Sequence, residues 1–264
     1  MPAPFLWPAI MGILNVTPDS FSDGGRYTSP AAAIAAGRQM LADGAAIIDV
    51  GGESTRPGAT PVSPTDEQAR ILPIIRGLAG IVPISVDTRN ASTMAAALDA
   101  GATVVNDVSA LTHDPAAMTL IASRGCPVIL MHMRGTPATM AGYAQYDDVV
   151  ADVVCALSNR VDAAVAAGID RRQIAIDPGF GFAKTADHNV ALVRGMDALR
   201  KLDLPIVAGL SRKRFLTALS GAERSVCASV AAALAAWAGG ARTLRVHDVA
   251  ETAQALRVWQ ALHD

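Results

Sequence analysis

Residues 174–181, IAIDPGFG, contain the pattern that decides the fold. A short apolar run ends at a carboxylate, Asp177, and a glycine-rich turn follows. Seven further runs of this kind occur along the chain: AIMGIL from Ala9, AIIDVG from Ala46, PISVD from Pro83, TVVND from Thr103, PVILMH from Pro127, PIVAGLS from Pro205 and TLRVHD from Thr243. Near-continuous apolar runs of this length predict the buried strands of a parallel sheet.

Alanine-rich segments with helical spacing separate the runs. Three of them begin with a polar residue followed by proline, which predicts a capped helix start: Ser29–Pro30, Ser63–Pro64 and Asp114–Pro115. Eight strand and helix units in about 250 residues are the count and length of a (β/α)8 TIM barrel. We therefore expect an α/β protein whose residues 1–264 form a single TIM-barrel domain.

The alternative fold is an open, doubly wound parallel sheet. In that fold, ligands bind where a few strands meet at a switch point, whereas a closed barrel brings all eight strand ends around one axis. Polar residues stand at or just after all eight runs: Asn15, Glu53, Asp87, Asn106, His132, Asp177, Lys213 and His247. This distribution favours the closed barrel.

The composition excludes several classes of protein. The 264 residues are 51% hydrophobic and 17% charged, with a formal net charge of −2. A disordered chain would be more polar, and a nucleic-acid-binding protein would carry a basic patch. We therefore expect small-molecule substrates and no nucleic-acid partner.

The termini and cysteines predict a cytoplasmic protein. MPAPFLWPAI at the N-terminus lacks the basic and long apolar regions of a signal peptide. The uncharged stretch from Val226 to Ala241 is shorter than the roughly 20 apolar residues of a membrane span, so it predicts a buried helix. Cys126, Cys155 and Cys227 form no CxxC pair and are interpreted as reduced core residues.

Two polar loops follow the first two runs. NVTPDSFSDGG at 15–25 contains hydroxyls, carboxylates and paired glycine, and the loop is longer than usual for such a unit. GGESTRPGA at 51–59 allows close backbone approach at its glycines, while Thr55 and Arg56 offer a hydroxyl and a guanidinium to an anion. A solvated surface loop is the alternative interpretation of both.

Two carboxylates that follow buried strands are candidates for ligand binding. Asp87 in SVDT and Asp177 in IDPGFGF would be costly to bury without donors. A heterocycle with two adjacent N–H groups would supply such donors, and Asn106 offers both a donor and an acceptor to the same ring. The alternative is an internal salt bridge to Lys213 or Arg245.

The last two strands supply cations. SRKRF at 211–215 follows the seventh run, and Arg245 and His247 share strand parity, so both are expected to face the barrel mouth. Loops after strands seven and eight form the usual phosphate site of this fold, so Lys213, Arg245 and His247 make a candidate anion cradle. The spacing of His, Cys and carboxylates does not predict zinc, but Mg2+ held mainly by substrate phosphates is compatible.

Taken in order, these motifs closely resemble dihydropteroate synthases. NVTPDSFSDGG, GGESTRPGA, SVDT, NDVSA, DPGFGF, SRK and RVHDV carry the resemblance, which covers the chain from about Ile10 to Val258. It implies a (β/α)8 enzyme of folate biosynthesis that condenses 6-hydroxymethyl-7,8-dihydropterin diphosphate with 4-aminobenzoate, and a target of sulfonamides. A pterin-binding methyltransferase barrel and a non-catalytic pterin-binding paralogue are the alternatives.

The resemblance also implies roles for residues. Pterin pocket positions match Asp87, Asn106, Asp177 and Lys213, with Arg245 over the pterin face; together these five are the expected catalytic residues. Diphosphate and Mg2+ positions match Asn15, Arg56 and His247, with Asn15 as the expected metal ligand. Aminobenzoate positions match Phe21, Thr55, Pro57 and Ser211. Mg2+ is the expected cofactor.

One residue departs from the family pattern. Arg214 stands where the family commonly has a small hydroxyl residue that helps to hold the aminobenzoate carboxylate. Arg214 either pairs with that carboxylate or points outward and leaves Ser211 and backbone amides to do so. Family members pair through their late helices, so the resemblance and the apolar helix at Val226–Gly239 predict a homodimer.

Overall fold

The computed structural model describes residues 5–16, 29–55 and 58–263. Its eight strands are parallel and are β1 (Ile10–Asn15), β2 (Ile47–Gly51), β3 (Ile84–Asp87), β4 (Val104–Asp107), β5 (Val128–Met131), β6 (Ile174–Asp177), β7 (Val207–Ala208) and β8 (Thr243–Val246). They pair in the order β6-β5-β4-β3-β2-β1-β8-β7. A bridge from Ile176 to Ile206 joins the two ends, which closes the barrel and confirms the expected fold.

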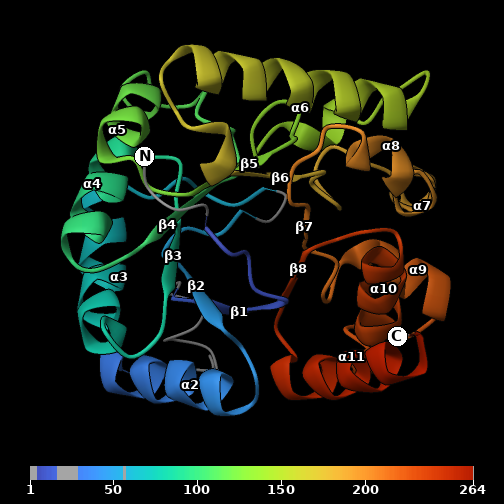
Figure 1. The fold of residues 1–264 in the computed structure, drawn as a ribbon, viewed down its shortest axis with the longest axis horizontal. Helices are drawn as coiled ribbons and strands as arrows, with labels where there is room; N and C mark the ends of the chain where they lie inside the picture. The colour runs from blue at the N-terminus through green and yellow to red at the C-terminus, as the bar shows by residue number, and fades with distance from the viewer. Residues whose placement is uncertain (1–4, 17–28, 56–57, 264) are drawn as a thin grey trace.

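Helices surround the strands on the outside of the barrel (Figure 1). They are α2 (Pro30–Ala42), α3 (Pro64–Leu78), α4 (Ala91–Asp99), α5 (Ala117–Arg124), α6 (Val149–Ala166), α7 (Ala186–Arg194), α8 (Met196–Arg200), α9 (Arg214–Ser220), α10 (Val226–Ala238) and α11 (Val249–His263). Figure 1 shows α9, α10 and α11 together on one flank. None of the helices within the described ranges is both long and apolar enough to cross a membrane.

Two of the three expected helix caps are confirmed. The Ser29 side chain accepts from the Ala32 N–H at the start of α2, and Ser63 accepts from the Asp66 N–H at the start of α3. The third expectation was wrong, because α5 begins at Ala117. Asp114 instead accepts from the Ala116 and Ala91 N–H groups, so its carboxylate joins the turn before α5 to the first turn of α4.

The barrel interior changes character along its axis. Near the amino ends of the strands it is apolar and buried, and is formed by Trp7, Met11, Ile47, Val104, Ile129, Ala175 and Val207. Every second side chain of a strand points to the same face of the sheet. Asp49 and Arg245 therefore also point into the barrel, one layer closer to the carboxyl ends of the strands. The polar residues are therefore concentrated toward the carboxyl ends, where the loops to the helices begin.

Two expectations about burial were wrong. Helix α10 is not a buried helix: Ser229, Ala233 and Ala236 are its buried residues, and the rest of its surface is partly or fully exposed. Cys155 and Cys227 are exposed and Cys126 is half-buried, so these free cysteines are not core residues. The physical reason for α10, Cys155 and Cys227 is that one side of a helix packs on the barrel and the other faces outward, whereas Cys126 lies in the turn between α5 and β5.

Candidate active site

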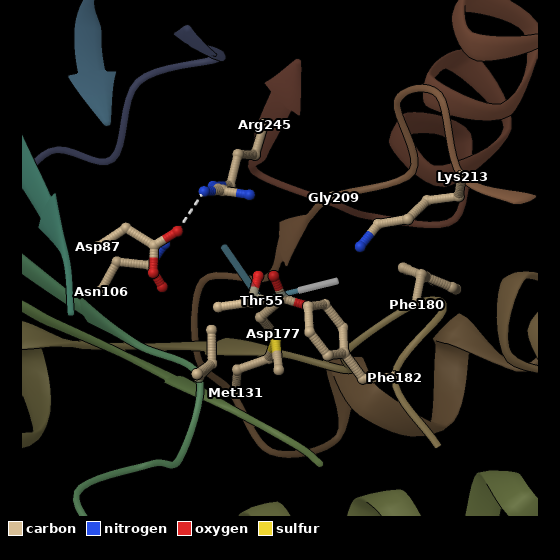
Figure 2. A pocket seen from close by; sticks show the side chains of 11 residues that line it. Thr55, Asp87, Asn106, Met131, Asp177, Phe180, Phe182, Gly209, Lys213 and Arg245 are labelled. Atoms are coloured by element: carbon tan, nitrogen blue, oxygen red, sulfur yellow. Dashed lines mark hydrogen bonds and ion pairs between the residues drawn. The ribbon is translucent and has the colours of Figure 1, made fainter. Parts of the chain in front are cut away.

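Six of the expected site residues line one pocket at the carboxyl ends of the strands. They are Thr55, Asp87, Asn106, Asp177, Lys213 and Arg245, and the same pocket is lined by Val108, Met131, Phe180, Phe182 and Gly209. In Figure 2, Asp87 and Asn106 lie on one side of it, and the Lys213 side chain enters from the opposite side. The barrel thus gathers two carboxylates, two cations and an amide from residues distant in sequence.

Arg245 on β8 connects two of the buried carboxylates. Its Nε lies 2.6 Å from Asp49 Oδ2, and its terminal nitrogen lies 2.6 Å from Asp87 Oδ2. Asn106 donates from its amide to the same Asp49 oxygen at 3.2 Å. For Asp87, the structure therefore shows the internal salt bridge that was the alternative to a ligand contact, and the partner is Arg245 rather than Lys213.

One guanidinium cannot neutralise two buried carboxylates, and this affects Asp87. Burial raises the pKa of Asp87 to about 7, Arg245 acts to lower it, and the like charge of Asp49 raises it further. The pKa of Arg245 is itself raised above its ordinary value, because the attraction of Asp49 and Asp87 outweighs burial. Arg245 is therefore a positively charged group that two ion pairs, with Asp49 and Asp87, hold in place.

Asp177 has a different environment from Asp87. The backbone N–H of Gly179 donates to its Oδ1 at 2.7 Å, and none of the ion pairs among the described residues includes it. Burial raises the pKa of the Asp177 carboxyl, while the Gly179 hydrogen bond and nearby cations act to lower it. A ligand that donates hydrogen bonds would stabilise the ionised form.

Lys213 brings a cation to the opposite wall of the pocket. Its ammonium lies 4.2 Å from the centre of the Phe182 ring, which is within the range of a cation–π contact. Burial and the charge of Arg245 lower the pKa of Lys213 to about 8, against the opposing effect of Asp177 and Asp87. The ammonium is therefore the predominant form near neutral pH.

Three expected residues lie at neighbouring strand ends. His247 Nδ1 and the Ser211 hydroxyl are hydrogen-bonded at 3.1 Å, and the His247 backbone N–H donates to that hydroxyl at 3.2 Å. Asn15 ends β1, and a Cβ placed on Gly51 would lie 3.5 Å from Asn15 Oδ1 and 3.6 Å from Asp87 Oδ2. Both oxygens therefore border the same glycine.

The remaining expected residues are not brought into the pocket by the described structure. Arg214 is the first residue of α9 and is exposed. Phe21, Arg56 and Pro57 lie outside the described residues. Of the expected anion cradle of Lys213, Arg245 and His247, Arg245 pairs with Asp49 and Asp87, and the cradle stays a prediction.

Sequence reasoning missed several residues of the site. Asp49 is fully buried on β2, and the signal that identifies it is a carboxylate inside an apolar strand. Glu53 was expected only as one of the polar residues at the strand ends, and its buried ion pair with Arg89 at 3.0 Å was not. Phe180 and Phe182 line the pocket within the GFGF motif. Lys184 follows that motif and binds three acceptors around it.

No group of three or more His, Cys, Asp or Glu side chains suited to a metal ion is found in residues 5–16, 29–55 and 58–263. The polar atoms at the pocket are oxygen and nitrogen donors of strand ends rather than a closed ligand set.

Comparison with known proteins agrees with this geometry. Residues 11–247 match the family described as pterin binding enzyme. A dihydropteroate synthase of Neisseria meningitidis serogroup B is 47% identical over 264 residues, which covers 97% of this chain and 93% of the relative.

Two solved structures of Xanthomonas albilineans dihydropteroate synthase are also similar. The complex with 4-aminobenzoic acid has a TM-score of 0.91 at 49% identity and covers 97% of this chain and 93% of that one. The complex with 7,8-dihydropteroate has a TM-score of 0.88 at 46% identity and covers 97% and 94%. With its closed barrel and its polar pocket at the strand ends, this chain belongs to the dihydropteroate synthase family of pterin-binding enzymes.

Proposed function

We propose that this chain condenses 6-hydroxymethyl-7,8-dihydropterin diphosphate with 4-aminobenzoate, releasing 7,8-dihydropteroate and diphosphate. The observation that carries the proposal is the pocket that gathers Asp87, Asn106, Asp177, Lys213 and Arg245 at one barrel mouth. Its two kinds of charge suit a substrate with a hydrogen-bonding heterocycle at one end and an anionic leaving group at the other. The relatives that this chain resembles in sequence and fold are dihydropteroate synthases.

Asp177 is the proposed anchor for the pterin ring. It is buried, its Oδ1 already accepts from Gly179, and its remaining acceptor capacity suits the amino and ring N–H groups of a pterin. Two parallel charge-assisted hydrogen bonds would then replace the water that burial removes. Such donors also favour the ionised carboxylate against the effect of burial.

Asn106 and Arg245 complete the ring site. The Asn106 amide donates to Asp49, which leaves its carbonyl oxygen to accept from a ring N–H. Arg245 is held by Asp49 and Asp87, so its planar guanidinium is preorganised to stack on a flat heterocycle. The carboxylates also provide negative charge near the ring when positive charge develops on the pterin methylene.

Lys213 and the strand ends around Asn15 and His247 face the leaving group in this proposal. As the C–O bond breaks, negative charge passes to the diphosphate, and the Lys213 ammonium stabilises it. The amine nitrogen of 4-aminobenzoate forms the C–N bond at the same carbon and then passes one proton to the released diphosphate or to water. The chain needs to bind and align the two substrates, and no protein nucleophile enters the reaction.

Mg2+ is a proposed cofactor of this reaction. The half-buried Asn15 amide oxygen lies at the end of β1 beside Gly51, and an amide oxygen is a ligand that Mg2+ accepts. Asn15 would supply the protein ligand and the substrate diphosphate most of the others. The ion would neutralise charge on the departing diphosphate.

Diphosphate release tests the proposed reaction. We expect the purified protein to release diphosphate from the pterin substrate only when 4-aminobenzoate and Mg2+ are both present, and Asp177→Asn to lose most of this activity. Release without 4-aminobenzoate would contradict the condensation. Pterin binding without any release would instead support the non-catalytic paralogue.

Arg214 is proposed to pair with the carboxylate of 4-aminobenzoate. It is exposed at the start of α9, directly after Lys213, so its guanidinium is free to reach toward the mouth. We expect Arg214→Ala to raise the KM for 4-aminobenzoate and to leave the KM for the pterin substrate unchanged. Arg257→Ala, at an exposed arginine of α11, is the matched control. An unchanged KM for 4-aminobenzoate in Arg214→Ala would exclude this role.

A homodimer and a cytoplasmic location complete the proposal. A groove of about 330 Å3, lined almost entirely by apolar side chains, lies between α7, α9 and α10, beside the exposed alanines of α10. Burying this surface against a second copy would remove apolar area from water. Light scattering at micromolar concentration should give twice the mass of the chain. The three free cysteines support a reducing compartment.

A further inference from the structure

Lys184 is a half-buried lysine next to the pocket that the proposed reaction does not use. Its ammonium lies 3.0 Å from each of three acceptors: the Gly179 carbonyl, the Phe182 carbonyl and Nδ1 of His132. Two of these acceptors belong to the GFGF loop, and the third belongs to the end of β5. The ammonium therefore connects two carbonyls of this loop to each other and to the end of β5.

The two carbonyls can accept from Lys184 in either protonation state, because an ammonium has three donors and a neutral amine has two. In the charged form, the third donor reaches His132, which accepts at Nδ1 and carries its proton at Nε2; a neutral amine would instead accept from an Nδ1–H. Both arrangements use a neutral imidazole, and burial together with the charges of Lys184 and Arg134 lowers the pKa of His132 to about 3.

The GFGF loop, residues 179–182, which Lys184 binds through two carbonyls, positions two groups that line the pocket. The Gly179 N–H donates to Asp177 Oδ1 at 2.7 Å, so the orientation of residue 179 sets the position of that carboxylate. The Phe182 ring packs against the Lys213 ammonium at 4.2 Å. Holding the carbonyls of residues 179 and 182 therefore holds both an anionic and an aromatic pocket group.

Lys184 is also coupled electrostatically to Asp177. Burial lowers the pKa of Lys184 to about 7, Asp177 acts to raise it, and the charges of Lys213 and Arg134 act to lower it. In return, the Lys184 charge acts with Lys213 and Arg245 to favour the ionised form of Asp177. Lys184 thus stabilises the ionised form of Asp177, the proposed pterin anchor, although it does not line the pocket.

We propose, on the basis of the reaction proposed above, that Lys184 is a positioning residue for the pterin substrate. Its ammonium holds the Gly179 and Phe182 carbonyls, and thereby sets Asp177 and Phe182 in the geometry that binds the ring. Thr55 and the strand ends near Asn15 are not tied by this contact, so binding of 4-aminobenzoate does not depend on it directly.

The test is a split between the two KM values. Lys184→Met keeps the length of the side chain and removes its charge and donors. We expect the KM for the pterin diphosphate to rise about tenfold or more, as the loss of hydrogen bonds to a charged group implies. The KM for 4-aminobenzoate should change by less than about twofold. Lys184→Arg should recover part of the pterin affinity, because it restores the charge and donors.

Lys201→Met is the matched control, because Lys201 is exposed at the end of α8. It should leave both KM values unchanged. If Lys184→Met does not fold, Lys184→Gln replaces it, since glutamine lacks the charge and its amide nitrogen is one bond too short to reach both carbonyls, and the same rise in pterin KM is expected. Thermal melts and circular dichroism monitor folding of each variant.

Each outcome has one meaning. An unchanged pterin KM in folded Lys184→Met or Lys184→Gln would overturn the positioning role. Equal losses for both substrates would assign Lys184 to general stability of the barrel and would also overturn it. Absence of diphosphate release by the unsubstituted protein would instead refute the proposed reaction, so the two failures are distinguishable.

Discussion

Asp49 illustrates how single residues define this pocket. It is fully buried in β2, and its Oδ2 accepts from both Arg245 and Asn106. It does not line the pocket, yet it orients two residues that do. The guanidinium that it holds also binds Asp87, so a carboxylate outside the pocket lining fixes the position of Arg245 in the pocket.

Gly179 is a position where the side chain must be absent. Its φ is +69°, and an added Cβ would lie 2.0 Å from the His132 carbonyl oxygen. We expect Gly179→Ala to lower the melting temperature and to abolish binding of the pterin substrate, because the backbone must move away from Asp177. Gly80→Ala is the control, since φ there is +75° but no atom lies within 4 Å of the added Cβ. Equal pterin binding by the two variants would contradict this prediction.

The charge of Lys213 predicts a pH dependence. Burial and Arg245 lower its pKa to about 8, so the ammonium predominates below that pH and is lost as the pH rises. We therefore expect kcat/KM for the pterin diphosphate to fall between pH 7 and pH 9. In Lys213→Arg the fall should be less steep relative to the value at pH 7, because arginine stays charged. Identical profiles would assign the alkaline loss to another group.

Among the elements, the segment that follows β2 is held in place by the ion pair of Glu53 and Arg89. Arg89 donates to both oxygens of Glu53, and Glu53 Oε1 also accepts from the Val62 N–H. Arg70 donates to the Gly52 carbonyl at 2.9 Å. These contacts bring the start and the end of the segment together and place Thr55 at the pocket.

Breaking that ion pair should be costly. Both side chains are less than 10% exposed, so Arg89→Met leaves Glu53 as a buried carboxylate without its cation. We expect the free energy of unfolding to fall by about 3 kcal/mol, measured by urea denaturation. Arg124→Met breaks an exposed pair with Asp99, so its free energy of unfolding should change much less than that of Arg89→Met. Similar losses in the two variants would show that burial of the Glu53 pair is unimportant.

The elements themselves were largely predictable from local patterns. All eight apolar runs form strands, and Ser29 and Ser63 cap the expected helices. The start of α5 was not, because the Asp114 carboxylate accepts from two chain segments at once and so does not act as a simple cap. The run from Pro205 contributes only the two residues of β7 to the ladder, although a bridge at Ile206 still closes the barrel.

In the whole molecule, the two ends of the barrel have opposite chemistry. Trp7 is 4% exposed and covers the apolar end together with Phe5, whose ring meets it edge-on at 4.9 Å. The polar pocket lies at the other end. The apolar layers thus stabilise the barrel. This stabilisation offsets the free-energy cost of the charged groups that are buried at the carboxyl ends of the strands.

Removing the apolar cover should destabilise the whole barrel without altering the pocket. We expect Trp7→Ala to lower the free energy of unfolding by about 3–5 kcal/mol through lost burial and a cavity. KM values for both substrates should stay the same at a temperature where the variant is folded. Trp259→Ala, at a half-buried residue of α11, should cost less. A changed KM in Trp7→Ala would show that the two ends are coupled.

The amino-acid pattern determined the closed barrel and most pocket residues, because strand periodicity, caps and polar strand ends are local properties of the chain. Tertiary structure decided the pairing of charges: Arg245 meets Asp49 and Asp87 across 196 and 158 positions, and Lys184 binds His132 across 52. It also decided that Cys155, Cys227 and much of α10 face outward. Such contacts depend on how the closed barrel aligns distant strands, and periodicity along one segment carries no information about them.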